Sequence, residues 1–205
     1  CRVVLLDNGS SEESTHQGIQ NFLKRDDLPF QVEVLRIDAP FNFSKLNNTA
    51  VYENRAFQAD SILFLNNDTE LLSPRALRQF FLFQAAQKNV GALGCTLVYP
   101  DQRIQHLFLA PAVKIVGAHP LKGTALHFGQ RWYQSPQPVA AVTGALLFIK
   151  AQTFFDVGGF DELLPTTGQD LDLCLKVQKL GLVNWVLPKI VVIHKETRTR
   201  KDKFN

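Results

Sequence analysis

Polar residues able to coordinate a metal follow directly on an apolar run in the stretch "ILFLNNDTELLSP". The apolar residues Ile62–Leu65 are followed by Asn66, Asn67 and Asp68. A carboxylate beside amide side chains suits a hard divalent cation, which takes oxygen ligands and keeps waters for substrate phosphates. The alternative is an Asx turn, since Asn and Asp also end strands through local hydrogen bonds. The tripeptide alone favours neither interpretation.

Two other segments carry groups of the same kind. The stretch "GQDLDLCLK" puts Asp170 and Asp172 in the first turn of a predicted helix, where the helix dipole by itself favours negative charge. Two residues apart on a helix, they point about 200° apart, so at most one can face a given site. His194 ends an apolar run. A histidine there is more often structural, and it becomes a candidate metal ligand only if it converges with Asp68.

Other candidate motifs are weaker or absent. Gly144 in "VTGA", and Gly158 and Gly159 in "VGGFDE", allow a backbone to approach a ligand closely or simply form turns. The chain has no dinucleotide fingerprint, no P-loop and no serine-hydrolase elbow. His106 and His127 lack partners at zinc-site spacing.

Strands and helices that would position these groups alternate along the chain. Strands are predicted over 2–7, 31–37, 61–65, 90–99, 142–149, 183–187 and 190–194. This alternation predicts an α/β fold with a mostly parallel central sheet flanked by helices, and continuous apolar strands agree because both their faces are covered. Ligands of such sheets bind beyond the carboxyl ends of strands, where Asp7-Asn8, Asn66–Asp68 and His194 stand.

Helix boundaries are predicted from capping residues and apolar stripes. Ser10 and Glu13 have capping-box spacing, and Ser44 and the Ser73-Pro74 pair are predicted to begin two further helices. The predicted stripes are Ile19, Phe22 and Leu23; Leu46, Ala50 and Phe57; Leu77, Phe80, Phe81 and Ala85; and Leu173, Val177 and Leu180, the last helix stopping at Gly181.

Composition excludes several classes of protein. The 205 residues are 45% hydrophobic and 20% charged, which is typical of a globular domain, and the net charge of +3 is too weak to indicate nucleic-acid binding. No apolar run approaches the ~18 residues of a membrane span, and no signal peptide is visible. The odd number of cysteines, Cys1, Cys95 and Cys174, indicates a reducing, cytoplasmic setting.

The two ends and one internal segment are distinctive. The chain starts at Cys1 in a strand-like run and contains no methionine, so a fragment is expected. The basic end "HKETRTRKDK" is either a binding site for phosphates or an anionic membrane, or a solvated terminus. Residues 100–138 are rich in proline, glycine and histidine and are predicted to form a functional loop or lid.

These segments occur together in the order seen in one known family. The chain resembles family 2 glycosyltransferases, in particular the rhamnosyl- and galactofuranosyltransferase-like branch of bacterial surface polysaccharide synthesis. The resemblance covers nearly the whole chain and rests on the following segments: "VVLLDNGS", "FNFSKLNNTAV", "ILFLNNDTELLSP", "VGALGCTLVYPDQRIQH", "VTGALLFIK", "VGGFDELLPTTGQDLDLCLKVQKLG" and "IHKETRTR".

The resemblance implies a single GT-A nucleotide-diphospho-sugar transferase domain over residues 1–205 that lacks the first strand of the family. It implies a nucleotide-sugar-binding half, residues 1–99, and an acceptor-binding, catalytic half, residues 100–205. The implied reaction is an inverting transfer, assisted by Mg²⁺ or Mn²⁺, from a UDP-, dTDP- or GDP-sugar to a glycan or lipid-linked acceptor. The implied location is the cytoplasm, with attachment to the inner face of the membrane left open.

Site residues are carried over position by position. Asp7 matches a residue that meets the nucleobase, Lys45 and Asn47 the segment lining the nucleotide, and Asn66-Asn67-Asp68 the DxD motif with asparagine in place of its first aspartate. Asp170 matches the aspartate of the ED motif, the implied general base, with Gln169 in the glutamate's place and Gly144 on the acceptor side. His194 matches a late histidine that completes the metal site with Asp68.

Two rival hypotheses stay open at this point. One is a catalytically inactive nucleotide-sugar-binding domain within a larger polysaccharide enzyme. The other is a non-enzymatic α/β interaction module, in which the polar strand ends are only turns. Metal-dependent nucleotide binding would exclude the interaction module, and sugar transfer would exclude the inactive domain.

Overall fold

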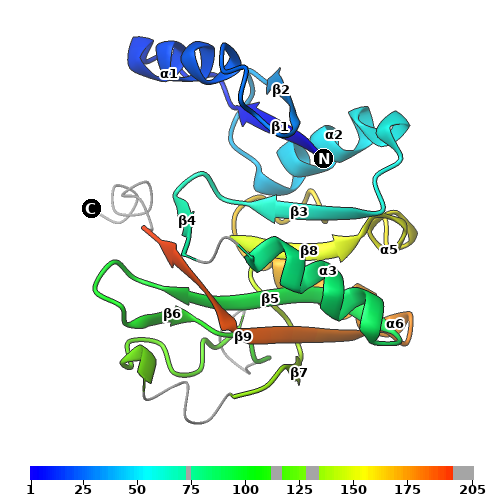
Figure 1. Ribbon diagram of the computed structural model, residues 1–205. Coiled ribbons are helices and arrows are strands. Elements are labelled where there is room, and N and C mark those ends of the chain that lie inside the picture. Colours follow the sequence, from blue (N-terminus) through cyan, green and yellow to red (C-terminus); the bar gives the residue numbers. More distant parts are fainter. Residues whose placement is uncertain (73–74, 112–116, 128–133, 196–205) are drawn as a thin grey trace. The chain divides into compact units, whose positions relative to one another are not determined.

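The computed structural model describes residues 1–72, 75–111, 117–127 and 134–195 (Figure 1). The chain forms two compact units. The first comprises Cys1–Gln58 and Phe160–Thr166, and the second comprises Ala59–Gly159 and Thr167–Asn205. This structural division does not fall at residue 99, and the two functional halves implied by the family remain a prediction.

The first unit is built on a parallel strand pair. Strand β1 (Arg2–Asp7) pairs with β2 (Gln31–Arg36) in the register Asp7↔Arg36, with helix α1 (Glu13–Leu23) connecting them along the chain. Helix α2 (Phe43–Glu53) and the short 3₁₀ helix η1 (Arg55–Phe57) follow. Both strands confirm sequence predictions. A parallel pair needs a long crossover connection, and the helix between the two strands supplies it.

Both predicted helix starts in this unit are wrong. The N-cap of α1 is Glu12, without a side-chain capping bond, and the backbone N–H of Ser10 instead donates to Asp7 Oδ1 at 2.9 Å. The N-cap of α2 is Asn42, whose side chain accepts from the backbone N–H of Lys45. Ser44 lies inside the helix, fully buried, and its hydroxyl donates to the carbonyl of Leu164 at 2.7 Å. The N-cap is the residue at which the backbone enters the helix, and several polar residues near each start could have occupied that position.

A buried amide fastens residues 160–166 to the first unit. Asn48 on α2 donates to the carbonyl of Phe160 at 2.9 Å and accepts from its N–H at 3.0 Å. The rings of Phe43 and Phe160 meet edge to face with centroids 5.4 Å apart. Of the predicted stripes, Leu46 and Ala50 are buried, whereas α1 buries none of its residues fully and Phe57 lies exposed in η1.

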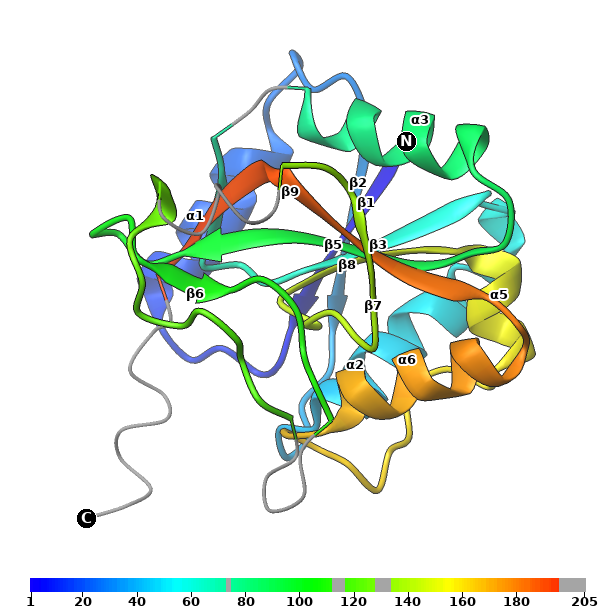
Figure 2. The same ribbon diagram turned by 90° about the horizontal axis from the view of Figure 1, so that it is seen from below.

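The second unit is built on a seven-stranded sheet, seen edge-on in Figure 2. The strand order is β3-β8-β5-β9-β4, with β6 paired to β5 and β7 to β9. The bounds are β3 Ser61–Leu65, β4 Thr69–Leu71, β5 Val90–Val98, β6 Ile104–His106, β7 Gln137–Val139, β8 Leu146–Lys150 and β9 Val183–His194.

The expected mostly parallel sheet is wrong for this unit. Among the described strands of this sheet, β5 and β9 pair in parallel and every other pair is antiparallel. Every residue of β5 is buried, so its continuous apolar run correctly indicates cover on both faces. Burial does not specify the direction of the neighbouring strand, which the connections decide.

Helices lie on opposite faces of this sheet. Helix α3 (Ala76–Ala86) covers one face, and α5 (Ala151–Asp156) and α6 (Gln169–Lys179) lie on the other (Figure 2). Phe80 of α3 stacks on Phe148 of β8 at 5.5 Å between centroids. The predicted α6 helix is confirmed, and Gly181 adopts a φ of 77° after its end.

The predicted stripe of α3 is largely wrong. The buried side chains are Ala76, Phe80 and Gln84, whereas Leu77, Phe81 and Ala85 are exposed. The predicted start at Ser73-Pro74 lies outside the described residues.

Two boundaries differ in the second half of the chain. The two strands predicted over 183–187 and 190–194 form one strand, β9, because a register shift opposite Cys95 and Thr96 accommodates Pro188. The hydroxyl of Thr96 donates to the Pro188 carbonyl at 2.9 Å. Strand β8 begins at Leu146, four residues later than predicted.

Segment 100–138 is more ordered than a plain loop in its described parts. It contains β6 and part of β7, and its buried residues include Ile104, Leu107 and Leu109. Across the part of the chain that the structure describes, no helix is both long and apolar enough to cross a membrane.

Candidate functional site

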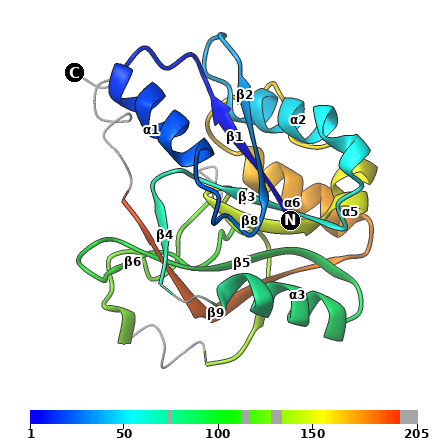
Figure 3. The ribbon, with the colours of Figure 1, turned by 45° about the horizontal axis from the view of Figure 1, so that its top comes forward.

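Asp68, Asn66 and His194 meet at one end of the second unit's sheet. Strand β4 lies beside β9 (Figure 3). Their pairing puts Thr69 opposite His194, and the N–H of Lys195 donates to the Asp68 carbonyl at 2.9 Å. His194 Nε2 lies 3.1 Å from Asp68 Oδ1 and 3.4 Å from Asn66 Nδ2. The predicted convergence of Asp68 with His194 is therefore present in the structure.

The turn that carries these residues is closed by other groups. The N–H and hydroxyl of Thr69 both donate to the carbonyl of Asn66, the hydroxyl at 2.6 Å. The side chains of Asn66 and Asp68 instead reach across to His194, more than a hundred residues further along the chain. Asn67 is exposed. A turn therefore exists, closed by Thr69, and it leaves the side chains of Asn66 and Asp68 directed at a distant histidine.

Gln105 determines which nitrogen of His194 carries its proton. The amide oxygen of Gln105 lies 2.6 Å from His194 Nδ1, and its amide nitrogen donates to the His194 backbone carbonyl at 3.3 Å. That second bond fixes which end of the amide faces the ring, since the nitrogen must face a carbonyl. An amide oxygen can only accept, so Nδ1 carries the hydrogen and the neutral ring has its lone pair on Nε2.

The neutral Nε2 therefore accepts from Asn66 Nδ2 at 3.4 Å and also lies 3.1 Å from a carboxylate oxygen, Asp68 Oδ1. Two acceptors at this distance repel one another unless a positive charge lies with them, either a proton on the ring or a cation bound by both. Two ligand atoms that each lie about 2.1 Å from one ion, with a right angle between the two metal–ligand bonds, are about 3 Å apart. The separation, the nitrogen and oxygen donors and the oriented imidazole all fit a shared divalent cation.

Asp68 and His194 would supply only part of a complete coordination sphere. Among the described residues, no third His, Cys, Asp or Glu joins them to make a group of three. Both side chains are about one-seventh exposed, at 16% for Asp68 and 13% for His194. A partly open site with two protein ligands leaves positions for waters and for the oxygens of a diphosphate.

Asp170 is held by two backbone N–H groups at the start of α6. Its Oδ2 accepts from the N–H of Gly144 at 3.1 Å, and its Oδ1 accepts from Leu171 at 2.9 Å. The preceding Gln169 is buried. Asp172 forms an ion pair with Lys176 at 2.7 Å, one turn further along the same helix. The two aspartates thus have different partners, as their divergent directions on the helix predict.

A short loop connects Asp170 with the Asp68 group. The N–H of Asn66 donates to the carbonyl of Ala145 at 2.9 Å, and the neighbouring Gly144 donates to Asp170. Residues 144 and 145 therefore touch both groups through backbone hydrogen bonds. The structure brings together Asn66, Asp68, Gly144, Asp170 and His194 within the second unit.

The predicted nucleobase residue Asp7 lies in the first unit with both carboxylate oxygens engaged. It accepts from the Ser10 N–H at 2.9 Å and from Arg36 Nη1 at 2.8 Å. Hydrogen bonds from Ser10, aided by the Arg36 guanidinium, hold the pKa of Asp7 below its usual range. Asp7 is therefore an ionised group that keeps Arg36, 43% exposed, in a fixed position.

Lys45 and Asn47 lie on α2 of the first unit. The Lys45 side chain is exposed, and Asn47 Nδ2 donates to the carbonyl of Phe43 in its own helix at 2.8 Å. Binding of a nucleotide by Asp7, Lys45 and Asn47, together with their convergence on Asp68, remains a prediction.

Sequence reasoning missed Gln105 and Arg36. In the stretch "QRIQH" the histidine stands out, and nothing local marks the glutamine beside it as the partner of a histidine on another strand. Arg36 stands directly opposite Asp7 in the β1–β2 register. That pairing could have been found by aligning the two predicted strands.

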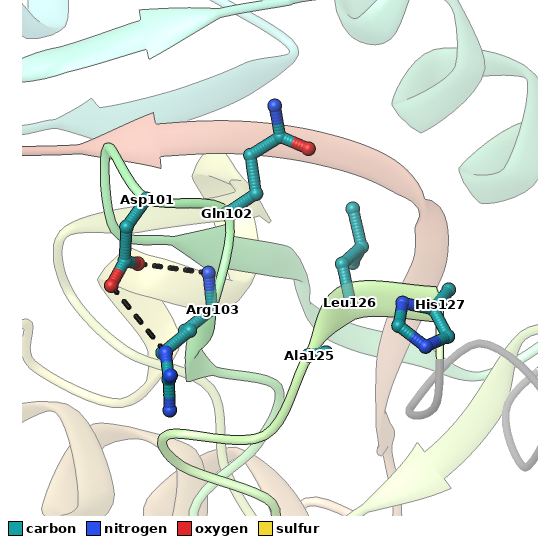
Figure 4. A pocket seen from close by; sticks show the side chains of 6 residues that line it. All are labelled: Asp101, Gln102, Arg103, Ala125, Leu126 and His127. Carbon is teal, nitrogen blue, oxygen red and sulfur yellow. Dashed lines mark hydrogen bonds and ion pairs between the residues drawn. The ribbon is translucent and has the colours of Figure 1, made fainter.

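His106 is buried beside a second histidine. Its Nδ1 lies 3.1 Å from Nδ1 of His119, and burial, aided by the nearby His119, lowers the pKa of His106 to about 3. It is therefore a neutral interior group. His127 lines a pocket of about 510 Å³ with Asp101, Gln102, Arg103, Ala125 and Leu126, in which Arg103 pairs with Asp101 (Figure 4). This pocket belongs to segment 100–138 and contains none of the predicted site residues.

Curated relatives share sequence along nearly the whole chain. An uncharacterized protein, y4gI, of Sinorhizobium fredii is 34% identical over 97% of this chain and 21% of its own length. The O-antigen biosynthesis protein RfbC of Myxococcus xanthus is 29% identical over 97% of this chain and 15% of its own. An N-acetylglucosaminyl-diphospho-decaprenol L-rhamnosyltransferase of Mycobacterium tuberculosis is 24% identical over 94% of this chain and 66% of its own. No family model matches the chain.

Solved structures share the fold at low sequence identity. GalNAc-T7 with UDP, GalNAc and Mn²⁺ superposes with a TM-score of 0.68 over 94% of this chain and 37% of its own, at 15% identity. The mannosyltransferase PcManGT of Pyrobaculum calidifontis, in complex with GDP-Man and Mn²⁺, gives 0.63 over 97% of this chain and 49% of its own, also at 15% identity.

These similarities confirm the fold class that the resemblance implied, a GT-A nucleotide-sugar transferase fold. The chain therefore has a GT-A fold and is similar in sequence to an O-antigen biosynthesis protein and to a rhamnosyltransferase, in agreement with its resemblance to family 2 glycosyltransferases. The chain spans about a fifth or less of the length of the first two curated relatives.

Proposed function

We propose that this chain catalyses an inverting transfer of a sugar from a nucleotide-sugar to a glycan or lipid-linked acceptor, assisted by Mg²⁺ or Mn²⁺. The observation that carries the proposal is the facing of two acceptors, His194 Nε2 and Asp68 Oδ1, at 3.1 Å, with the His194 tautomer set by Gln105. Such a pair is suited to a divalent cation. The names of the relatives, O-antigen biosynthesis and decaprenol-linked rhamnosyl transfer, support the substrate class.

Asp68 and His194 would hold the cation, which when bound neutralises charge on the leaving diphosphate. Asn66, which is uncharged and lies 3.4 Å from His194, would donate a hydrogen bond to the donor ribose or sugar. Asp7, Lys45 and Asn47 would contact the nucleotide, and Gly144 and Gln169 would lie on the acceptor side.

Asp170 would act as the general base. Its carboxylate takes the proton of the acceptor hydroxyl while that oxygen forms a bond to the anomeric carbon. The bond between the anomeric carbon and the diphosphate breaks, and the nucleoside diphosphate leaves from the opposite face, so the configuration inverts. The N–H groups of Gly144 and Leu171 fix the carboxylate in one orientation.

The same proposal places the reaction on the cytoplasmic side of a bacterial cell envelope. The buried free thiols of Cys95 and Cys174 are consistent with a reducing setting. Polysaccharide assembly is the implied process, and the donor base is one of those in UDP-, dTDP- or GDP-sugars.

Calorimetric titration with each nucleoside diphosphate, with and without Mn²⁺, tests the proposal. We expect binding that requires Mn²⁺ and that is lost in Asp68→Ala and His194→Ala. Transfer from a matching donor should fall by about 10²–10⁴-fold in Asp170→Asn, with metal-dependent binding retained. Asp172→Asn is the matched control, because Asp172 lies on the same helix turn and pairs with Lys176 instead. This variant should keep both metal-dependent binding and transfer.

Other outcomes would support one of the rival functions or change the role of Asp170. Absence of metal-dependent nucleotide binding would indicate an interaction module. Metal-dependent binding with no transfer or donor hydrolysis would indicate an inactive nucleotide-sugar-binding domain. Equal loss of binding in Asp170→Asn and Asp68→Ala would remove Asp170 from the role of base.

A further inference from the structure

The outer surface of α3 exposes large apolar side chains. Leu77 is 40% exposed, Phe81 50% and Leu82 56%. The helix is anchored through its other side, where Ala76, Phe80 and Gln84 are buried. Apart from the edge of the Phe81 ring, which contacts Phe148, the exposed apolar area does not contribute to the core that holds the helix on the sheet.

Basic residues alternate with these apolar side chains. Arg75, Arg78 and Lys88 are exposed, and the sequence from Leu71 to Asn89 contains no aspartate or glutamate. On an α-helix, residues three and four apart are neighbours, so Arg75, Arg78 and Leu82 form one stripe and Leu77 and Phe81 another beside it. The outer surface of α3 is thus apolar and uniformly positive.

We propose that this surface docks on a membrane containing anionic lipids. Leu82 and Phe81 would enter the boundary between headgroups and acyl chains, and Arg75 and Arg78 would meet lipid phosphates. A uniformly positive surface disfavours a second copy of the chain, because two such faces related by a twofold axis would oppose arginine with arginine. The mixture of apolar and basic groups favours a lipid surface.

Docking through α3 would also affect the proposed transferase. Strand β4, which places Thr69 opposite His194, leads within a few residues into α3. A lipid-linked acceptor carries its reacting sugar near the headgroups. Docking would therefore hold the Asp68–His194 end of the sheet close to such an acceptor, a consequence that rests on the proposed function, whereas the docking itself does not.

Co-sedimentation of the 205-residue chain with vesicles tests the docking without any donor or metal. We expect binding to vesicles of phosphatidylethanolamine with phosphatidylglycerol, weak binding to phosphatidylcholine vesicles, and loss of binding at high salt. The variant Arg78→Gln/Leu82→Gln should bind anionic vesicles at least about fivefold more weakly, the amount expected for the arginine alone. Leu82 is preferred to Phe81 because the Phe81 ring also contacts Phe148.

The matched control is Lys179→Gln/Leu180→Gln. Both residues are exposed, Leu180 at 49%, at the end of α6 on the opposite face of the sheet (Figure 2). Like Arg78→Gln/Leu82→Gln, this variant loses one positive charge and one leucine. It should bind vesicles as strongly as the unchanged chain does. Circular dichroism of both variants excludes unfolding as the cause of weaker binding.

Three outcomes would overturn the proposal. Equal binding of the two double variants would mean that the basic end of the chain, intact in both, binds the vesicles. Equal binding to anionic and phosphatidylcholine vesicles would remove the role of the arginines. Self-association of the chain that Arg78→Gln/Leu82→Gln abolishes, without vesicle binding, would assign the surface to a second copy.

Discussion

His194 owes its proposed role to two neighbours from distant parts of the chain. Gln105 accepts from its Nδ1, and Asp68 faces its Nε2. The imidazole could otherwise carry its hydrogen on either nitrogen or rotate away. Hydrogen bonds to the second nitrogen of a metal-binding histidine typically matter about 10–100-fold for affinity.

Replacing Gln105 with leucine should weaken Mn²⁺ binding about 10–100-fold, because His194 Nδ1 would lose its acceptor. Gln105→Glu keeps an acceptor and should restore most of the affinity. Titration of Mn²⁺ followed by paramagnetic relaxation of water protons measures this without any transfer reaction. Nitrogen chemical shifts of His194 report the tautomer, which should become mixed in Gln105→Leu. The exposed Gln79→Leu is the control; an unchanged tautomer and affinity in Gln105→Leu would refute the role of Gln105.

Strand β5 shows how tightly the elements that support the site are packed. All its residues are buried, and its glycines leave no room for a side chain. A Cβ on Gly94 would lie 2.6 Å from the Cβ of Val142, itself fully buried. Val142 precedes the loop that holds Asp170, so packing against β5 supports the position of that loop.

Substitution of Gly94 with alanine should destabilise the second unit by about 1–3 kcal/mol, since the new methyl group overpacks a rigid core. Gly18→Ala should act in the opposite direction. Gly18 lies inside α1, and an added methyl group would meet no neighbouring atom within 4 Å, so alanine should stabilise its unit by about 0.5–1 kcal/mol. Urea unfolding with separate probes measures both; destabilisation by both changes equally would contradict this packing argument.

At the scale of the whole molecule, buried polar groups tie distant segments together within each unit. Asn184 of β9 accepts from the Ala92 N–H and donates to the carbonyls of Ala140 and Cys174. Asn48 does the same for residues 160–166 in the first unit. His106 is different, because its burial opposes its charged form and makes the stability of the fold depend on pH.

The free energy of unfolding should fall as pH decreases through the window between the two pKa values of His106. In the unfolded chain this pKa is about 6.5, and burial lowers it to about 3 in the folded protein. Between these values the unfolded state binds a proton that the folded state does not, so stability is lost with acidification, by up to about 1.4 kcal/mol per pH unit. Urea unfolding from pH 7 to pH 4 should show a shallower dependence in His106→Leu. The exposed Gln79→Leu, which removes no titratable group, should not change the slope.

Local pattern predicted much of this protein from sequence. The apolar runs at 2–7, 61–65 and 90–98 are strands, and residues 169–179 form a helix, because hydrophobic periodicity and stop residues act within a few residues. The convergence of Asp68 and His194 was predictable as well. Both follow apolar strands, β3 and β9, which run in the same direction and so end at the same edge of the sheet, where β4 pairs with β9.

Tertiary structure decided the features that depend on distant partners. Strand direction in the second unit was predicted wrongly, because an apolar run indicates burial and carries no information on the direction of its neighbours. Gln105 was not predicted, because its partner His194 lies 89 residues away in the sequence. The helix start at Asn42 and the burial of Ser44 inside that helix also involve long-range contacts, with residues 162 and 164. Sequence determines which groups can do chemistry, whereas pairing across the fold determines which of them meet.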